Sequence, residues 1–195
     1  MQLDFPWYKI KNKDEDITQG DIILSCPVPV IDYDEDYPYF KPQYMLQDVI
    51  VMTQACDLEN NKVRNVTLCK IGSLEKQVKE HFDYRNKDNK DYNYETISPR
   101  SKFKYAKEII QGKYLDLYFL NKFDNGQYKV PYRLVYLRDS YKIPVHSLKK
   151  FIESKEDSEI LSLLPPYREH LSQHFSFNFS RIGLPVNIAL SEEEF

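Results

Sequence analysis

One apolar run constrains the fold of this chain more than any other stretch. Val49-Ile-Val-Met52 is the densest β-branched run in the sequence, and it is bounded by Asp48 on one side and by the polar run 56–61 on the other. An apolar run of this length, followed by turn residues, is typical of a strand that is buried on both faces. We therefore expect a central strand at 49–53, with the rest of the fold built around it.

Polar side chains gather where this strand ends. Thr53 and Gln54 leave the strand, and Cys56, Asp57 and Glu59 follow directly. Loops on a rigid scaffold often carry function, so we take this cluster as a candidate site, with Thr53 catalytic and with Gln54 and Asp57 binding a ligand. The acidic neighbours of Cys56 disfavour a thiolate nucleophile there. The alternative is that the cluster is simply the exit of a strand into water, with Asp57 capping the next turn.

Apolar periodicity and turn residues place the other elements. We expect strands at 22–24, 65–71, 114–120 and 128–137, the last two joined by a hairpin turn at Asp124-Asn-Gly126. We expect helices at 73–82, 99–111, 157–164 and 165–183, and a short helix or turn at 144–152. Residues 1–19 are expected to form an extended arm that docks Trp7 on the body of the protein.

Two stretches are expected to lack regular structure. Residues 26–44 contain four prolines and the acidic cluster 32–36. Because proline has no amide hydrogen and a fixed φ, this density excludes a central strand or a helix and predicts a long surface loop. Residues 83–98 are rich in Asp, Asn, Lys and Tyr without periodicity, which predicts a mobile insertion.

Length and cysteine content bound the class of protein. At 195 residues the chain is one domain, or one domain with an appendage, and is long enough to bury a sizeable core. Its three cysteines include no CxxC pair, which argues against a disulfide framework and for a reducing compartment. Residues 1–20 lack the pattern of a signal peptide, and no apolar run approaches the ~20 residues that span a bilayer. We therefore expect a cytoplasmic protein that does not enter a membrane.

The net charge of −3 hides a strong asymmetry along the chain. Residues 1–50 contain ten acidic and four basic side chains, a net charge of −6, whereas residues 101–150 contain eleven basic and four acidic side chains, a net charge of +7. Such a division predicts either a polar interaction surface or two parts of the chain that attract each other in the fold.

The basic part of the chain interleaves lysine and arginine with tyrosine and phenylalanine. Lysine and arginine neutralise phosphates and aromatic rings stack on bases, so this pattern indicates nucleic-acid binding, with RNA expected more than DNA. We assign phosphate contacts to Lys129, Arg133 and Arg138. The alternative is an ordinary half-buried strand, because the two classes of side chain fall on opposite faces of the strand at 128–137.

The last predicted helix carries His170 and His174 four residues apart, so they share a face. A zinc site needs at least three protein ligands, and no spacing supplies the third, so we expect no metal. With Asn178 and Arg181 they form a polar stripe that faces either a phosphate or water. We assign Arg181 to binding and His170 to a base that would assist Thr53. The chain has no Gly-rich phosphate loop, no Ser-His-Asp order and no HExxH motif, so we expect no cofactor.

Three short motifs follow one another in the first part of the chain. Gly20-Asp21-Ile22-Ile23 is followed by Val49-Ile-Val-Met-Thr53 and then by Val66-Thr-Leu-Cys-Lys-Ile71. Over residues 19–72 this succession resembles the opening of the MazF/PemK toxin family. The resemblance implies an SH3-like barrel with helices, usually a homodimer, that cleaves single-stranded RNA.

The resemblance also bears on the candidate site. Thr53 falls where the family places its site Ser or Thr. The position of the family's catalytic arginine, just before the second strand, is occupied by Leu46, Gln47 and Asp48. The resemblance therefore implies the family's fold without its standard ribonuclease site.

Together these observations predict an α+β fold with a small, SH3-like, mostly antiparallel β-barrel and with inserted and C-terminal helices. Residues 1–152 would form the barrel-like domain, and residues 153–195 would form a helical appendage packed on it. The function we favour is a nucleic-acid-binding interaction module of a prokaryotic toxin–antitoxin or phage-defence system, without a standard ribonuclease site. One alternative is an endoribonuclease with a rearranged active site that uses Thr53 with Arg64 or His170. Another is an accessory subunit whose acidic N-terminal part binds a basic protein partner.

Overall fold

The apolar run at 49–52 lies at the centre of a seven-stranded sheet in the computed structural model, which describes residues 5–126, 128–156 and 159–180. Val49, Ile50 and Val51 end strand β3 (Phe40–Val51), and each is 0 % exposed. β3 is the fourth strand of the sheet, between β2 (Asp21–Tyr33) and β4 (Asn65–Ser73). The prediction of a central strand buried on both faces is confirmed.

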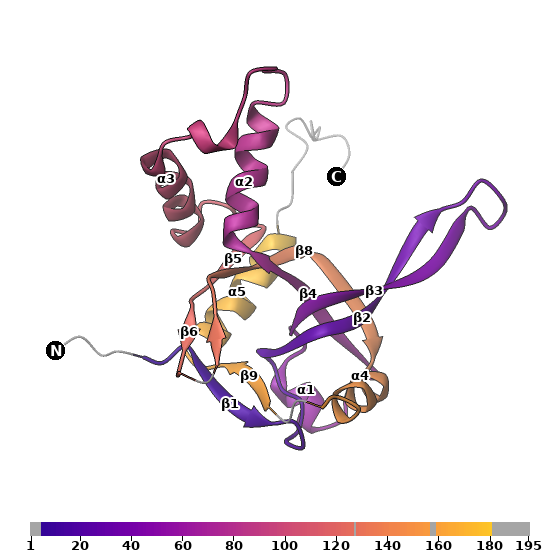
Figure 1. Cartoon of the computed structure of the whole chain (residues 1–195). Coiled ribbons are helices and arrows are strands. Elements are labelled where there is room, and N and C mark those ends of the chain that lie inside the picture. Colours follow the sequence, from indigo (N-terminus) through magenta and orange to yellow (C-terminus); the bar gives the residue numbers. More distant parts are fainter. Residues whose placement is uncertain (1–4, 127, 157–158, 181–195) are drawn as a thin grey trace, which may run out of the picture.

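All pairs of strands in the sheet are antiparallel, in the order β1-β9-β2-β3-β4-β8-β5. The four strands that flank these three are β1 (Tyr8–Asn12) and β9 (Glu159–Leu163) on the side of β2, and β8 (Arg133–Pro144) and β5 (Leu117–Leu120) on the side of β4. The sheet is strongly curved, but it is not closed, because β1 and β5 remain as its two edges (Figure 1). The predicted α+β class with a mostly antiparallel sheet is confirmed.

Two helices stand together above the β5 end of the sheet (Figure 1). These are α2 (Leu74–Arg85) and α3 (Pro99–Ile110), joined by a segment that contains the 3₁₀ turn η1 (Tyr94–Thr96). Ser73 and Ser98 cap the two helices, since each side chain accepts a hydrogen bond from a backbone N–H three residues later. Both helices lie where the sequence predicts them.

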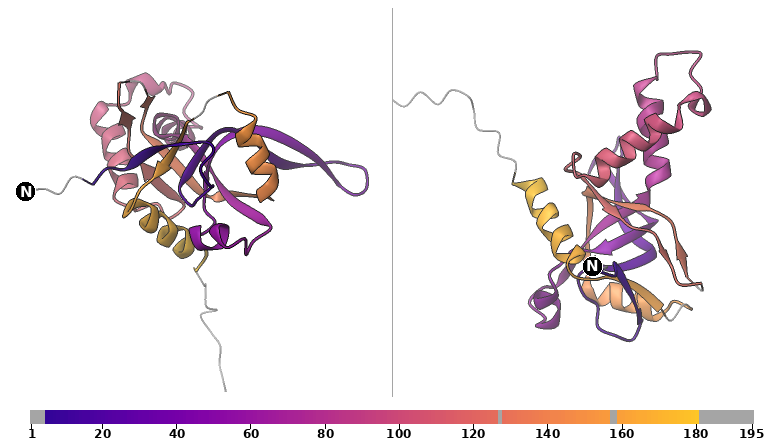
Figure 2. Two further views of the ribbon diagram at one scale, coloured as in Figure 1. Left: turned by 90° about the horizontal axis from the view of Figure 1, so that it is seen from below. Right: turned by 90° about the vertical axis from the view of Figure 1, so that its left-hand side faces the viewer.

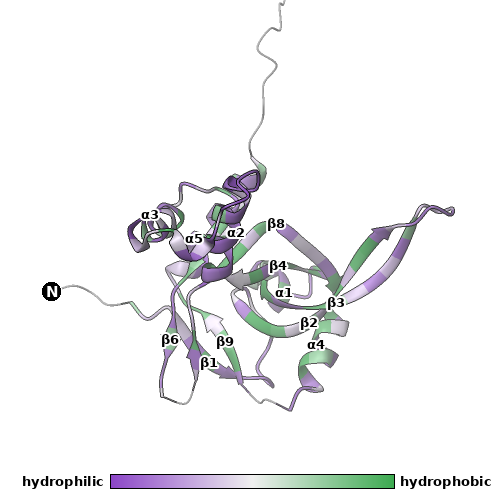
Figure 3. Cartoon of the chain, turned by 45° about the horizontal axis from the view of Figure 1, so that its top comes forward, coloured by the Kyte–Doolittle hydropathy of each residue, from purple (hydrophilic) through white to green (hydrophobic). Residues whose placement is uncertain are grey.

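The core is divided between the two faces of the sheet. Val49 and Val51 point into a cluster that includes Leu148 of α4 (Val145–Glu153). Ile50 points into the opposite cluster, which includes Leu171 of α5 (Tyr167–Phe179). This alternation is the period-two geometry of a strand between two layers. Hydrophobic residues accordingly gather on the strands and on α4 where they face one another (Figure 3).

The prolines of residues 26–44 do not produce the predicted surface loop. β2 and β3 continue as a two-stranded arm that extends away from the sheet (Figures 1 and 2). The ladder places Pro27 opposite Leu46, Pro29 opposite Tyr44 and Ile31 opposite Pro42.

These prolines fit a strand because of where they fall in the ladder. Hydrogen-bonded and non-hydrogen-bonded pairs alternate along an antiparallel ladder. The three cross-strand pairs that contain the prolines are spaced by two residues, so all three belong to the same class. Since proline cannot donate, these are the pairs whose backbone groups point away from the partner strand. The arm also has no further strand beside it among the described residues, because β2 pairs with β9 only at residues 21–22 and β3 pairs with β4 only at residues 49–51. No ladder hydrogen bond is therefore lost.

The helix predicted at 157–164 is wrong, because residues 159–163 form strand β9 between β1 and β2. Ile160, Leu161 and Leu163 are buried, and a short apolar run of this kind cannot be assigned to helix or strand by periodicity alone. β9 belongs to the main sheet, so this sheet contains strands from both predicted parts of the chain, residues 1–152 and residues 153–195.

Several smaller differences concern the connections. The polar segment after β3 contains the short helix α1 (Ala55–Glu59), and the return strand of the predicted hairpin is divided into β7 (Lys129–Val130), which pairs with β6 (Phe123–Asp124), and β8. Trp7 does dock, since its ring stacks on Tyr167 with 3.8 Å between centroids. No helix within the described residues has the length and apolar content needed to cross a membrane.

Candidate functional site

The polar residues that follow β3 line a hollow of about 540 Å³ between α1, β4 and α5. We call it the polar hollow, and define it by the side chains that give it its character: Thr53, Gln54, Asp57, Arg64, Thr67, Lys142, Ser172, Phe175 and Ser176. The structure therefore brings together Thr53, Gln54 and Asp57, the three neighbouring residues that the sequence singled out.

Thr53 is held in place by the strand beside it. The backbone N–H of Thr67 in β4 donates to Thr53 Oγ1 at 2.7 Å, and the N–H of Met52 donates to the carbonyl oxygen of Thr67 at 2.8 Å. The Thr53 hydroxyl accepts in this contact, so its own hydrogen remains to be donated. Thr53 thus presents a hydroxyl donor in a fixed position at the wall of the polar hollow.

Two cationic side chains reach the polar hollow from different strands. Arg64 directly precedes β4, and Lys142 lies opposite Thr67 in the β4–β8 ladder. Neither side chain is in an ion pair with any described residue. Asp57 is the single carboxylate among the described residues that line the hollow, so these residues carry a net positive charge and can attract an anion.

The wall contributed by α5 adds hydroxyl groups and an aromatic ring. Ser172, Phe175 and Ser176 project from one side of this helix. The hydroxyl of Ser176 donates to the carbonyl oxygen of Ser172 at 3.1 Å, which leaves its oxygen able to accept. The site thus combines cations, hydroxyls and one ring surface.

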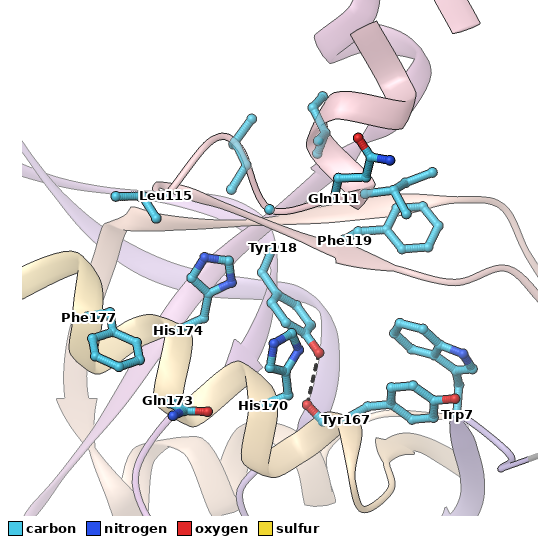
Figure 4. A pocket seen from close by; sticks show the side chains of 14 residues that line it. Trp7, Gln111, Leu115, Tyr118, Phe119, Tyr167, His170, Gln173, His174 and Phe177 are labelled. Carbon is cyan, nitrogen blue, oxygen red and sulfur yellow. Dashed lines mark hydrogen bonds between the residues drawn. The ribbon is translucent and has the colours of Figure 1, made fainter. Parts of the chain in front are cut away.

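The opposite side of α5 faces a second hollow, of about 600 Å³, which we call the aromatic hollow (Figure 4). Its polar members include His170 and His174, and its rings include Trp7, Tyr118 and Tyr167. The Tyr118 hydroxyl donates to the carbonyl oxygen of Tyr167 at 3.0 Å, and both imidazole rings contact the edge or face of the Tyr118 ring.

The position of α5 between the two hollows corrects one prediction. A helix turns by roughly 100° per residue, so His170 and Ser172 point in nearly opposite directions. His170 lines the aromatic hollow, whereas Thr53 lines the polar hollow. The structure therefore does not assemble the predicted catalytic pair of Thr53 and His170.

The protonation of His174 is tied to folding. Burial lowers the pKa of its imidazole, and the neighbouring His170 lowers it further. Its Nδ1 atom is buried and has no hydrogen-bond partner among the described residues. The neutral imidazole is therefore the form that the aromatic hollow favours.

This shift predicts a loss of stability in mild acid. The pKa of His174 in the folded protein lies below its unfolded value of about 6.5, so the unfolded chain binds more protons as the pH falls below that value. We expect the free energy of unfolding to decrease between pH 7.5 and pH 5.5, and the decrease to be smaller in His174→Leu. Urea denaturation at several pH values measures this. Burial also lowers the pKa of His81, so His81 adds a pH dependence of the same sign. The variant His81→Leu, measured in parallel, separates the contribution of His81 from that of His174. An unchanged pH dependence in His174→Leu would contradict the assignment.

The other predicted binding residues do not form one basic face. Lys129 Nζ lies 3.8 Å from a carboxylate oxygen of β6, and Arg133 Nη1 lies 3.2 Å from Asp48 Oδ2. Arg138 is exposed on β8, and none of the three lines the polar hollow. Arg181 lies outside the described residues. Two of the assigned phosphate contacts are thus engaged with acidic side chains of the same chain.

No group of three or more His, Cys, Asp or Glu side chains suited to a metal occurs within the described ranges. The three cysteines are free, and burial raises the pKa of Cys26 to about 11 and that of Cys69 to about 12. The exposed Cys56 lies beside the polar hollow, where its Sγ is 3.8 Å from the side-chain oxygens of both Gln54 and Asp57.

Comparison with known proteins gave no match to a family model, to a curated protein or to a solved structure. The resemblance to the MazF/PemK family rests on the sequence motifs alone and stays a prediction.

Proposed function

We propose that this protein binds single-stranded RNA in the polar hollow. The observation that carries the proposal is that Arg64 and Lys142, neither of them in an ion pair with a described residue, line one hollow with the hydroxyls of Thr53 and Thr67. Cationic side chains that flank hydroxyl donors are the groups that bind phosphate.

The same hollow also offers contacts for the base and for the ribose of a nucleotide. The ring of Phe175 supplies a surface on which a base can stack, and stacking contributes roughly 1–3 kcal/mol per base. The carboxylate of Asp57 can accept a hydrogen bond from a ribose 2′-hydroxyl, a donor that DNA lacks. A concave site that takes one base at a time favours a single strand, whose bases can be turned out.

The proposal is binding without cleavage. Thr53 has a fixed hydroxyl, but the imidazole assigned to it lies on the other side of α5, and residues 46–48 do not include the arginine that the MazF/PemK resemblance would require. Arg64 alone is a poor proton acceptor because it stays charged. A role in a prokaryotic toxin–antitoxin or phage-defence system, in the cytoplasm, is part of the proposal and follows from that resemblance.

Comparison of RNA with DNA tests the proposal. We expect a fluorescein-labelled single-stranded RNA to bind more tightly than the DNA of the same sequence in fluorescence anisotropy at 50 mM salt. Asp57→Ala is expected to reduce the ratio of the two affinities, because it removes the acceptor for the 2′-hydroxyl. Equal affinities for RNA and DNA would contradict the role of Asp57. Electrophoresis of the same mixtures reports cleavage, and cleavage that is lost in Thr53→Ala would support the ribonuclease alternative instead.

A further inference from the structure

The arm formed by β2 and β3 has two faces of different character. Directly opposite residues in an antiparallel ladder point to the same side, so the register assigns each side chain to a face. One face begins with Cys26 and Val28, which are buried in the core, and continues through Gln43 to Asp32 and Lys41. This inner face fixes the base of the arm to the sheet.

The other face carries no polar or charged side chain apart from tyrosine hydroxyls. We call it the outer face, and it consists of Pro27, Pro29, Ile31, Tyr33, Phe40, Pro42, Tyr44 and Leu46. Tyr33 is 79 % exposed, Tyr44 is 75 % exposed and Ile31 is 67 % exposed. Hydrophobic residues thus continue into the arm well beyond the sheet (Figure 3).

The area of the outer face is that of an interface. Its three aromatic side chains, which are 49–79 % exposed, offer on the order of 100–200 Å² each, and with the exposed Ile31 and Leu46 and the prolines the outer face presents roughly 600–800 Å² in all. Each partner in a protein–protein interface of standard size contributes about 800 Å². Monomeric proteins rarely leave a contiguous apolar patch of this size in water.

We propose that the outer face binds the outer face of a second copy of this chain, with the two arms antiparallel. A face without charges meets no electrostatic conflict when it is paired with itself, and one patch that serves both subunits is the geometry of a twofold dimer. Tyr33 and Phe40 of one copy would then cover Pro27 and Leu46 of the other, with Tyr44 near the axis.

The acidic end of the arm sets the orientation. Asp32, Asp34, Glu35 and Asp36 lie at or near the tip, and Lys41 is the only base in residues 32–41. Parallel arms would bring two such tips together, and like charges repel. Antiparallel arms move the tips apart, because the paired part of the arm from Pro27 to Tyr33 is roughly 20 Å long. This inference does not depend on RNA binding.

Sedimentation velocity of the full chain from 1 to 100 µM tests the dimer. We expect the wild-type protein to be dimeric at the upper end of this range. We expect Tyr44→Arg, which places a charge at the centre of the outer face, to raise the dimer dissociation constant at least about 30-fold, as for an interface hot spot. Gln43→Arg is the matched control, because the neighbouring residue lies on the inner face, and we expect less than about a 3-fold change.

Two results would overturn the proposal. One is a wild-type protein that is monomeric throughout the concentration range, which would leave the outer face to a different partner. The other is a dimer that Tyr44→Arg does not weaken, which would place the interface elsewhere. Circular dichroism of each variant shows whether it is folded, and Ile31→Asp is a second outer-face variant for use if Tyr44→Arg does not fold.

Discussion

Replacement of Lys11 by Met is expected to lower the free energy of unfolding by about 3–5 kcal/mol. Lys11 Nζ lies 2.6 Å from Asp21 Oδ2, and the two side chains are 2 % and 0 % exposed. The pair joins β1 to β2 across β9, whose Ser162 hydroxyl donates to Asp21 Oδ1 at 2.7 Å. The backbone N–H of Thr18 donates to the other carboxylate oxygen at 2.9 Å.

The large effect follows from the charge that the substitution leaves behind. Burial raises the pKa of the Asp21 carboxyl, and the ammonium group of Lys11, with the donors on Thr18 and Ser162, opposes that rise. Without Lys11 the carboxylate is buried with no cation beside it, and removal of one partner of a buried ion pair costs far more than removal of both.

Chemical denaturation of three variants separates these contributions. Lys11→Met should be the least stable, and the double variant Lys11→Met with Asp21→Asn should recover at least about 1–2 kcal/mol, because the amide needs no counter-charge. Asp21→Asn alone leaves the ammonium group of Lys11 without a counter-charge among the described residues, although the carbonyl oxygen of Asp16 still accepts from it at 2.6 Å. A double variant as unstable as the sum of the two single variants would show that the pair does not stabilise the junction of the three strands.

Reversal of the two cations in the polar hollow is expected to weaken RNA binding at least about 100-fold. In Arg64→Glu with Lys142→Glu, two phosphate contacts are replaced by two repulsions, and like charges placed against each other cost several kcal/mol. Both residues are exposed and make no ion pair with a described residue, so the substitutions should leave the free energy of unfolding within about 0.5 kcal/mol of the wild type.

The control for this prediction has the same change in net charge at another place. Lys104 and Lys107 are exposed on α3 and do not line the polar hollow. Lys104→Glu with Lys107→Glu should weaken binding by less than about 3-fold at 150 mM salt, since screening removes most of the attraction beyond about 8 Å. A similar loss in both double variants would mean that the RNA senses only the net charge of the protein.

The features that could be predicted from the sequence are those that depend on residues close together in the chain. The buried strand at 49–52 needs only its own apolar run, and the starts of α2 and α3 need only Ser73 and Ser98 with the residues that follow. Thr53 and Asp57 are four residues apart, so a site at the end of β3 could be expected as well.

The features that were missed depend on pairing between distant segments. Proline rules out a central strand, but only the register of β2 against β3 shows that Pro27, Pro29 and Pro42 all take positions that need no donor. Lys142 enters the polar hollow because β8 pairs with β4 at Thr67, 75 residues earlier in the chain. The apolar stripe of the last helix, which includes Leu171 and Phe175, indicates which side packs on the sheet. It does not indicate on which side of the helix Thr53 lies, because that depends on how distant strands are placed, so the separation of His170 from Thr53 could not be predicted.

The dependence of RNA affinity on salt tests the central claim most directly. Anisotropy of a labelled single-stranded RNA, titrated with the wild-type protein and with Arg64→Gln at several salt concentrations, gives the slope of log affinity against log salt. Two phosphate contacts predict a slope of roughly −1.4, and removal of Arg64 predicts roughly −0.7. No binding at 50 mM salt, or a slope that Arg64→Gln leaves unchanged, would contradict RNA binding in the polar hollow.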